Sequence, residues 1–324
     1  MIYGNKTLLA FIFVAISSAF TSADLFAAKL LIVRPKGADM DAVSTVVKGD
    51  LSSHEIQEVF FEKGDSEEKL NDAIKSFKPN ALSIFDNKAL SAALKVSGKG
   101  PGFPQTSVTM ALNVKKKVSG DKNMCGIAFE VPALTIVTKF RQATGGNIKN
   151  VLTFYRSGEF NELIVEAKNQ LHKEGINLIA IDLEKEASSA ESLNKIVKEK
   201  LSEKYEGTAI DAIIIPTDNI ILNKDAFASI WIEKAKSLKV PFLCNVEKFT
   251  SKEFNFCSYA AYPDYEELGH QYSEQLTELL SGTQSSDLSV DYIVSAKQTA
   301  NYDKLKELGI KILDEKKTDV KAAQ

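Results

Sequence analysis

Cysteine and histidine are scarce in this chain, and their scarcity excludes several kinds of site. Only three cysteines and three histidines occur among the 324 residues. None of them follows the ligand spacing of a zinc or iron–sulfur centre, so we expect no metal. The chain also lacks a Walker-type phosphate loop and a serine nucleophile elbow. The sequence therefore predicts a protein that is not an enzyme and that has no cofactor.

Charge of one sign is not in excess either. The chain has 40 Lys and Arg against 43 Asp and Glu, which gives a net charge of −3. Nucleic acids and anionic membranes need a basic surface, so we expect neither as a partner. A composition that is 44% hydrophobic and 26% charged is ordinary for a soluble globular protein, and the length predicts about two domains. We expect a monomer.

The long apolar run of the chain lies close to its amino terminus. Lys6 precedes an apolar stretch at 8–16, and Thr21-Ser22-Ala23 has the small residues of a cleavage site. This pattern predicts a secretory signal peptide over residues 1–28, with cuts after Ala23 or Ala27. The apolar run is too short to span a membrane, and no cysteine follows it to accept a lipid. We expect a mature protein in the periplasm or its equivalent; a retained membrane anchor is the alternative.

Two of the cysteines, Cys244 and Cys257, leave a question open. Both fall near the ends of strands that we expect to be neighbours. In an oxidising compartment they can form a disulfide, and otherwise they stay as two buried thiols. The sequence supports both alternatives.

Short apolar runs alternate with amphipathic segments along most of the chain. Such alternation is typical of β-α units, and repeated β-α units form a mainly parallel sheet. The run Gly98 to Pro104 predicts a loop, and the lysines at 115–117 predict a solvated face. We expect strands at 30–33, 56–61, 81–85, 106–112, 151–155, 176–181, 209–215, 240–243 and 290–294, with a short strand within 125–132 and a matching segment at 257–263. We expect helices at 67–77, 87–96, 133–143, 159–173, 193–205, 227–238 and 265–280.

One strand motif occurs twice. Residues 213–219 read Ile-Ile-Ile-Pro-Thr-Asp-Asn, and residues 82–87 make the same change from an apolar run to Asp-Asn. We infer an internal duplication with two similar α/β lobes, whose strand ends face a shared cleft. The spacing from Asp86 to Asp218 also pairs Asn113 with Asn245, Val114 with Val246, Lys116 with Lys248, Cys125 with Cys257 and Ala128 with Ala260.

Four segments of the second half resemble the periplasmic substrate-binding proteins of ABC transporters, in the group whose better-described members bind aromatic amino acids. The segments are Asp211–Asn219, Ala235–Pro241, Tyr259–Gly269 and Leu305–Ile310. The resemblance implies an α/β fold of the type I periplasmic-binding-protein architecture, with two Rossmann-like lobes, parallel sheets and ligand between the lobes. It also implies a membrane permease as partner.

The resemblance is incomplete at two turns. The chain has Asp86-Asn87-Lys88-Ala89 where the family has a small-residue turn, and of the family's Asn-Pro-Gly-Glu loop only Gly158-Glu159 remains. These differences leave the ligand open. The expected organisation is a signal peptide over 1–28, an N-terminal lobe over 29–129 and 261–284, a C-terminal lobe over 130–260 and 285–314, and a flexible tail over 315–324.

Polar residues follow the predicted strands and are candidates for ligand binding. Asp218 can bind an ammonium group, with Thr217 and Asn219 orienting it, and Arg156 beside Ser157 can bind a carboxylate. Helix capping is the alternative for Asp218 and Asn219, and a solvated edge for Arg156. The remaining candidates are Asp86 and Asn87, with capping favoured; Asn113, Asn245 and Glu247, with turn capping as alternative; and Tyr155, Phe129 and Tyr262 for stacking, with core packing as alternative.

We therefore expect an extracytoplasmic solute-binding component of an ABC transporter. It would close on a small molecule, with an amino acid as one candidate, by a hinge motion between its lobes. A periplasmic ligand sensor or interaction module without a transport role is the alternative. A third possibility is a degenerate member whose cleft is filled and whose role is structural.

Overall fold

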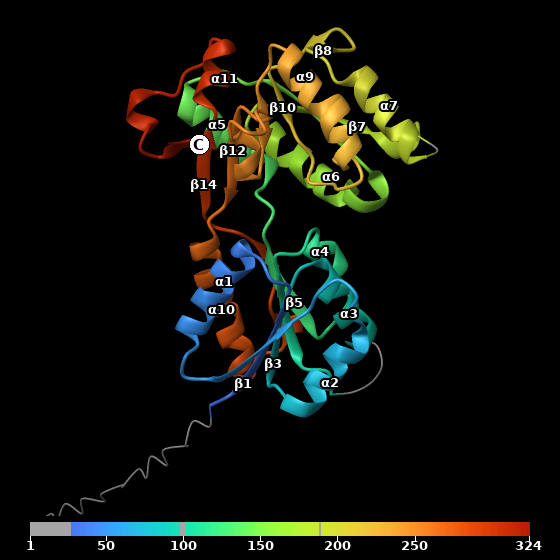
Figure 1. The fold of residues 1–324 in the computed structure, drawn as a ribbon, viewed down its shortest axis with the longest axis vertical. Coiled ribbons are helices and arrows are strands. Elements are labelled where there is room, and N and C mark those ends of the chain that lie inside the picture. Colours follow the sequence, from blue (N-terminus) through green and yellow to red (C-terminus); the bar gives the residue numbers. More distant parts are fainter. Residues whose placement is uncertain (1–26, 98–101, 188) are drawn as a thin grey trace, which may run out of the picture.

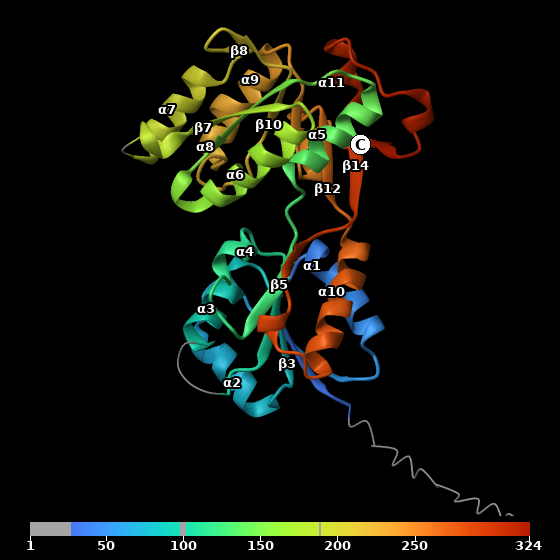
Figure 2. The same ribbon diagram turned by 180° about the vertical axis from the view of Figure 1, so that it is seen from behind.

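The computed structural model describes residues 27–97, 102–187 and 189–324. They form two lobes, one above the other in Figure 1 and seen from behind in Figure 2. The predicted signal peptide lies outside the described residues except for its last two positions, as does most of the predicted loop at 98–104. Within the described part of the chain, no helix is long and apolar enough to cross a membrane.

The first lobe is built on a parallel sheet with the strand order β13-β5-β4-β3-β1-β2. Its inner strands are unbroken buried runs, as in the Leu-Leu-Ile-Val segment of β1, because helices cover both faces. The elements are β1 (Lys29–Arg34), α1 (Ala38–Asp50), β2 (Glu55–Phe60), α2 (Glu67–Phe77), β3 (Ala81–Phe85), α3 (Asn87–Ser97), β4 (Gln105–Thr109), α4 (Val114–Lys117), β5 (Met124–Ala128), α10 (Tyr265–Leu280) and β13 (Val290–Tyr292).

The second lobe has the sheet order β15-β14-β12-β11-β10-β6-β7, in which β14 runs antiparallel to β12. Apolar clusters cover both of its faces, one around Trp231 and one around Phe140. The elements are α5 (Ala133–Thr144), β6 (Asn150–Tyr155), α6 (Ser157–Lys173), β7 (Asn177–Asp182), α7 (Ala190–Lys200), the hairpin β8 (Lys204–Tyr205) and β9 (Thr208–Ala209), β10 (Ala212–Ile214), α8 (Lys224–Ala226), a π-helical turn (Phe227–Trp231), α9 (Ile232–Ser237), β11 (Phe242–Cys244), β12 (Tyr259–Pro263), β14 (Ala296–Ala300), α11 (Tyr302–Glu307) and β15 (Val320–Ala322).

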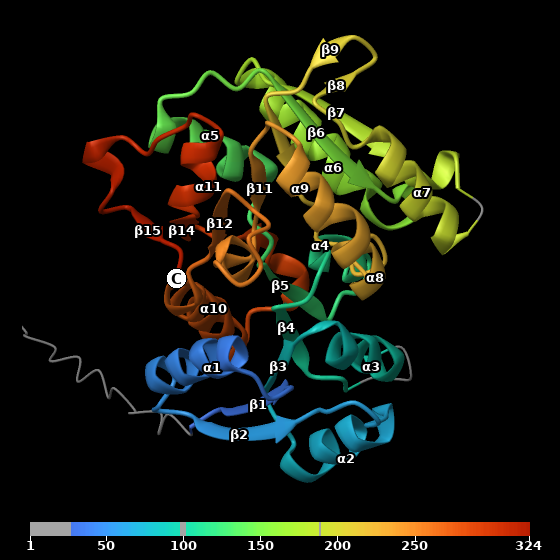
Figure 3. The same ribbon diagram turned by 45° about the horizontal axis from the view of Figure 1, so that its top comes forward.

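Each lobe takes one helix from the other half of the sequence. Helix α10 follows the second sheet in the chain but packs on the first, where the Tyr272 hydroxyl donates a 2.6 Å hydrogen bond to the carbonyl of Ser107. Helices α1 and α10 lie side by side (Figure 3), and Gly269 permits their approach, because a Cβ there would lie 2.6 Å from the Cβ of Val46. Helix α5 follows the first sheet but packs in the second lobe through Phe140.

These exchanges fix the connections between the lobes. In the described chain three segments join them, between β5 and α5, between β12 and α10, and between β13 and β14 (Figure 2). The two sheets share one strand order, since β5-β4-β3-β1-β2 corresponds to β12-β11-β10-β6-β7. This is the arrangement that the sequence repeat predicts, and the predicted fold class is confirmed.

The positions of several segments differ from the expectation. Strand β13 lies in the first sheet, where the expected organisation gave residues 285–314 to the C-terminal lobe. Strand β12 lies wholly in the second sheet, although the expected boundary fell at 261. The expected tail contains β15, which pairs with β14. Helix α1 and strand β14 were not predicted, and the end of the helix expected at 193–205 forms β8.

Candidate functional site

The carboxyl ends of β6 and β10 border a cavity of about 100 Å³ in the second lobe. These strands are neighbours at the point where the strand order of the sheet reverses, which is where open α/β sheets place ligands. Most of the lining is apolar. Helix α6 contributes Phe160, Leu163 and Ile164 to it, and the segment that leads into α5, with the first turn of that helix, contributes Val131 and Ile136. The first lobe and the connecting segments contribute Leu112, Glu130 and Tyr292.

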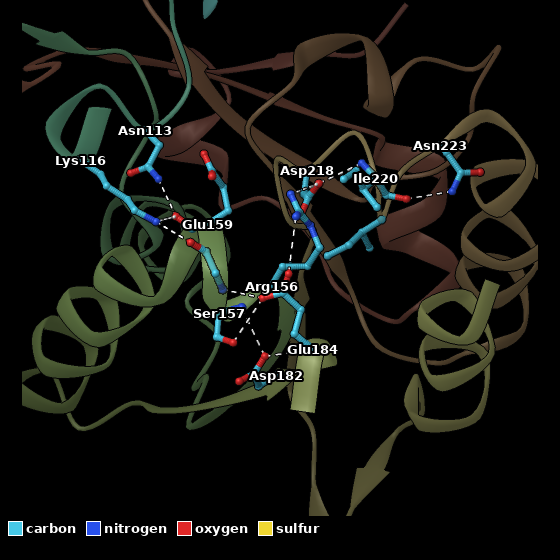
Figure 4. A network of polar contacts seen from close by, with 12 residues as sticks. Asn113, Lys116, Arg156, Ser157, Glu159, Asp182, Glu184, Asp218, Ile220 and Asn223 are labelled. Carbon is cyan, nitrogen blue, oxygen red and sulfur yellow. Dashed lines mark hydrogen bonds and ion pairs between the residues drawn. The ribbon is translucent and has the colours of Figure 1, made fainter. Parts of the chain in front are cut away.

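A buried ion pair lies beside this cavity. Arg156 follows β6 and Asp218 follows β10, and the Nε and Nη2 atoms of Arg156 lie 2.6 and 3.2 Å from the two carboxylate oxygens of Asp218 (Figure 4). Asp218 is only 4% exposed, and it also accepts the backbone N–H of Ile220 at 2.9 Å. Burial opposes the charge of Arg156, but the bond to Asp218 raises the pKa of the guanidinium. Each residue therefore supplies the charge that the sequence analysis expected from a ligand.

The start of α6 is also occupied by protein carboxylates. The backbone N–H of Ser157 donates to Asp182 at 3.3 Å, and the hydroxyl of Ser157 and the N–H of Gly158 donate to Glu184 (Figure 4). Glu184 also lies 3.7 Å from Arg156. These groups neutralise the positive end of the helix, which is the place expected for a ligand carboxylate.

The two lobes contact each other where α4 meets α6. The side-chain amide of Asn113 donates to the carbonyl of Glu159 at 2.6 Å, and the Lys116 ammonium donates to the carbonyls of Gly158 and Glu159 at 2.6 and 3.2 Å (Figure 4). The salt bridges Lys115–Glu166 and Lys117–Glu159 flank these bonds at 3.3 and 3.6 Å. The lysines predicted to form a solvated face thus form an interlobe contact.

Glu130 lies in the first connecting segment and was not among the predicted residues. It is 7% exposed and lines the cavity. Its Oε1 atom accepts the backbone N–H of Asn113, whereas its Oε2 atom is buried and has no hydrogen-bond partner among the described residues. Burial raises the pKa of this carboxyl, and the N–H of Asn113 and the charge of Lys117 only partly oppose the shift. The sequence signal that could have identified Glu130 is an acidic residue between two hydrophobic ones, Phe129 and Val131.

The first-lobe candidates have local partners. Asp86 accepts the backbone N–H groups of Lys88 and Ala89, each at 2.9 Å, and so caps α3. Asn87 accepts a 2.8 Å hydrogen bond from Lys117. Phe129 packs partly buried against the core of the first lobe.

The second-lobe candidates divide into two groups. Tyr155, Thr217, Asp218 and Asn245 line the cavity, and the side-chain amide of Asn245 donates to the Thr217 hydroxyl at 2.7 Å. Among the described residues, the Tyr155 hydroxyl has no hydrogen-bond partner. The remaining candidates lie off the cavity. Tyr262 donates to Glu247 at 3.0 Å, and Asn219 is exposed.

The described residues offer no metal site, and their cysteines are free thiols. They contain no cluster of His, Cys, Asp or Glu that could hold a metal ion. Cys125, Cys244 and Cys257 are buried and free.

The chain matches one family model over residues 105–322, and that family is described as ABC transporter substrate binding protein. No curated protein sequence matches this chain. Three solved structures are similar in fold, and each match covers 92% of this chain. An ABC domain from Streptococcus pneumoniae in complex with L-Trp is 18% identical, with a TM-score of 0.59 and 100% of that chain covered. A conserved domain protein from Vibrio cholerae has the same three values. A substrate-binding protein with adhesive properties from Clostridium difficile, in a ligand-free, open structure, is 16% identical, with a TM-score of 0.65 and 99% of that chain covered.

Proposed function

This chain belongs to the family of ABC transporter substrate binding proteins, and from that premise we propose that it binds a small molecule between its lobes and delivers it to a membrane permease. The family and the type I periplasmic-binding-protein fold support a solute-binding role outside the cytoplasm. The observation that supports the location of the site is the cavity at the carboxyl ends of β6 and β10, which the connecting segments border.

Closure of the lobes would control access to this cavity. The cavity is lined by α6, and α4 of the first lobe contacts the start of the same helix through Asn113 and Lys116. Opening would break these contacts and free one side of the cavity. A ligand shifts such an equilibrium only by its higher affinity for the closed form, and contacts with both lobes and the connecting segments would supply that difference.

Ligand size follows from the volume of the cavity. A cavity of about 100 Å³ is smaller than the roughly 150 Å³ that accommodates benzene in an engineered protein core. A small aliphatic molecule therefore fits better than an aromatic amino acid, which would require α6 to move outward. An amino acid remains one candidate class, and the Streptococcus pneumoniae relative in fold is in complex with L-Trp.

We assign the ligand contacts to the candidates that line the cavity, namely Tyr155, Thr217, Asp218 and Asn245. Arg156 would hold Asp218 in place. Positioning or structural roles suit the other candidates better. Asp86, Asn87, Asn113, Ser157, Asn219 and Glu247 lie in caps, interlobe contacts or surface positions, and Tyr262 is buried in the core of the second lobe. The signal peptide stays a prediction.

The test is to fill the cavity. Protein freed of bound molecules by unfolding and refolding would be titrated calorimetrically with small metabolites, after mass spectrometry has identified the molecules released on unfolding. Ala167 is buried in the lining, so Ala167→Leu should lower the affinity for the released ligand by tenfold or more. Val165 is 50% exposed on the same helix, and Val165→Leu should bind as the natural protein does.

Equal affinities in the two variants, with both folded, would contradict the location of the site. If no small molecule is released and none of the metabolites binds, the solute-binding role itself fails. Binding without uptake in transport-competent cells would favour the sensor alternative.

A further inference from the structure

Acidic side chains line the cavity without basic ones, and Glu130 is the acidic residue that lacks a cationic partner among the described residues. Three carboxylates, those of Glu130, Glu166 and Asp218, belong to the residues that line the cavity, and none of those residues is Lys, Arg or His. Asp218 is paired with Arg156. Glu166 accepts a 3.0 Å hydrogen bond from the Tyr292 hydroxyl and forms a 3.3 Å salt bridge with Lys115. Glu130 has no such partner within residues 27–97, 102–187 and 189–324.

No cation from the residues that the structure describes bonds to the Glu130 carboxylate. Lys117 is the charge that acts on it, but the Lys117 ammonium donates to Asn87 and to the carbonyl of Leu112, each at 2.8 Å, and pairs with Glu159. In the described part of the chain, the N–H of Asn113 bonds to Oε1 of Glu130, and the N–H of Glu130 itself also favours the charged form, but Oε2 has no hydrogen-bond partner. A buried carboxylate without a full set of partners destabilises the folded state, so a residue of this kind at a cavity points to a partner from outside the chain.

We propose that Glu130 binds the ammonium group of a ligand, and that the ligand is a small amine with an aliphatic body and no carboxylate. The proposal rests on the proposed function and names its ligand class. The aliphatic body would contact Phe160, Leu163 and Ile164 of α6. Among the described residues, a ligand carboxylate has no free cation at this cavity, since Asp218 takes two donors of Arg156 and Asp182 and Glu184 cover the start of α6.

Three probes of one shape separate the possibilities. 3-Methylbutylamine carries the ammonium group, leucine has the same branched body with an added carboxylate, and 3-methyl-1-butanol has no charge. Calorimetric titration of the refolded natural protein should give the amine an affinity at least tenfold above those of leucine and the alcohol. Loss of a charge-assisted hydrogen bond in Glu130→Gln should then lower the amine's affinity about tenfold or more.

The melting temperature separates a ligand-binding role of Glu130 from a structural one, because loss of a structural residue would lower it. The amide of Glu130→Gln keeps an acceptor for the Asn113 N–H and removes the incompletely paired charge, so the melting temperature of the ligand-free variant should stay level or rise while its affinity for the amine falls. Glu162 is exposed on α6, and Glu162→Gln should change neither quantity.

Other results would overturn the inference. These are tighter binding of leucine than of the amine, absence of amine binding by the natural protein, and a Glu130→Gln variant that loses stability but retains affinity. Each is compatible with a solute-binding protein of another specificity, which the molecules released from the natural protein would identify. The proposed function itself fails only if the natural protein releases no small molecule on unfolding and binds none of the metabolites.

Discussion

The two lobes place an arginine at matching strands but surround it differently. Arg34 ends β1 and turns toward the edge of the first sheet, where it pairs with Glu58 at 2.7 Å and with Asp41 at 2.6 Å. Arg156 follows β6, the matching strand of the second sheet, and turns toward β10 to pair with Asp218. The first arrangement ties a helix to an edge strand. The second forms a polar wall beside the cavity at the point where the strand order reverses.

The repeated Asp and Asn residues also differ between the lobes. Asp86 caps α3, whereas Asp218 accepts a backbone hydrogen bond from Ile220 and pairs with Arg156. Asn113 bridges the lobes, whereas Asn245 bonds within its own lobe to Thr217. The two lobes of the duplicated framework therefore differ in use, since the second lobe provides most of the cavity lining and the first lobe contacts it.

The largest expected effect separates the two aspartates. Asp218→Asn should lower the free energy of unfolding by about 2 kcal/mol, because it removes the buried charge that pairs with Arg156, although Glu184 stays 3.7 Å from the guanidinium. Asp86→Asn should cost less than about 0.5 kcal/mol, since Asn caps helices as well as Asp does and tolerates the positive φ of 76° at this position. Urea denaturation of both variants measures the contrast. Equal losses would mean that the two sites are equivalent.

A smaller effect tests the interlobe contact, and the sequence repeat provides the control. Lys116→Met removes the ammonium that joins α4 to the start of α6, and should shift the lobes toward an open form by about 1 kcal/mol. Lys248 is the repeat partner of Lys116 but is exposed in the second lobe. Small-angle X-ray scattering should therefore show a larger radius of gyration for Lys116→Met and no change for Lys248→Met. Identical radii would show that the contact does not hold the lobes together.

The smallest effect is a pH dependence of opposite sign at two glutamates. Burial opposes the charge of Glu58, but Arg34, Ser44 and Lys48 lower its pKa below 4.5, so its contribution to stability is present above the unfolded-state pKa and is lost as pH falls through the folded value. Burial raises the pKa of Glu130, so the natural protein loses stability as pH rises through that value.

Thermal melts from pH 7 down to pH 4 should show this difference. The deficit of Glu58→Gln relative to the natural protein should shrink only at the acidic end of that range. Any gain in stability of Glu130→Gln over the natural protein should shrink as pH falls and Glu130 becomes protonated, because burial raises the pKa of this carboxyl. A gain that persists at acidic pH would contradict the assignment of the raised pKa to Glu130.

Much of the fold could be predicted because buried parallel strands form unbroken apolar runs. The expected bounds of β3 and α10 agree with the structure, and the expected α6 and α5 differ by a residue or two at their ends. Strands β14 and β15 were missed because they are short, partly exposed and near the sheet edge, so their sequences lack such a run. Helix α1 was missed because apolar residues are sparse on its face, which is buried mainly by α10 from the far end of the chain.

The site could be predicted only in part, for a different physical reason. The sequence predicted which residues follow the strands, and four of these line the cavity. It could not show that Arg156 would meet Asp218, since that pairing depends on β6 and β10 being neighbours. Glu130 was missed because its burial depends on the path of a connecting segment that has no periodic pattern.

The central claim is that ligand binds at the carboxyl ends of β6 and β10, beside the connecting segments. A crystal structure of the protein with the small molecule that it retains on purification tests this most directly. We expect that molecule in this cavity, where it contacts α6, the ends of β6 and β10 and the residues from the first lobe and the connecting segments, with a nitrogen within hydrogen-bond distance of the Glu130 carboxylate. A ligand bound against the first-lobe strand ends near Asp86, or on an outer surface of either lobe, would contradict the claim.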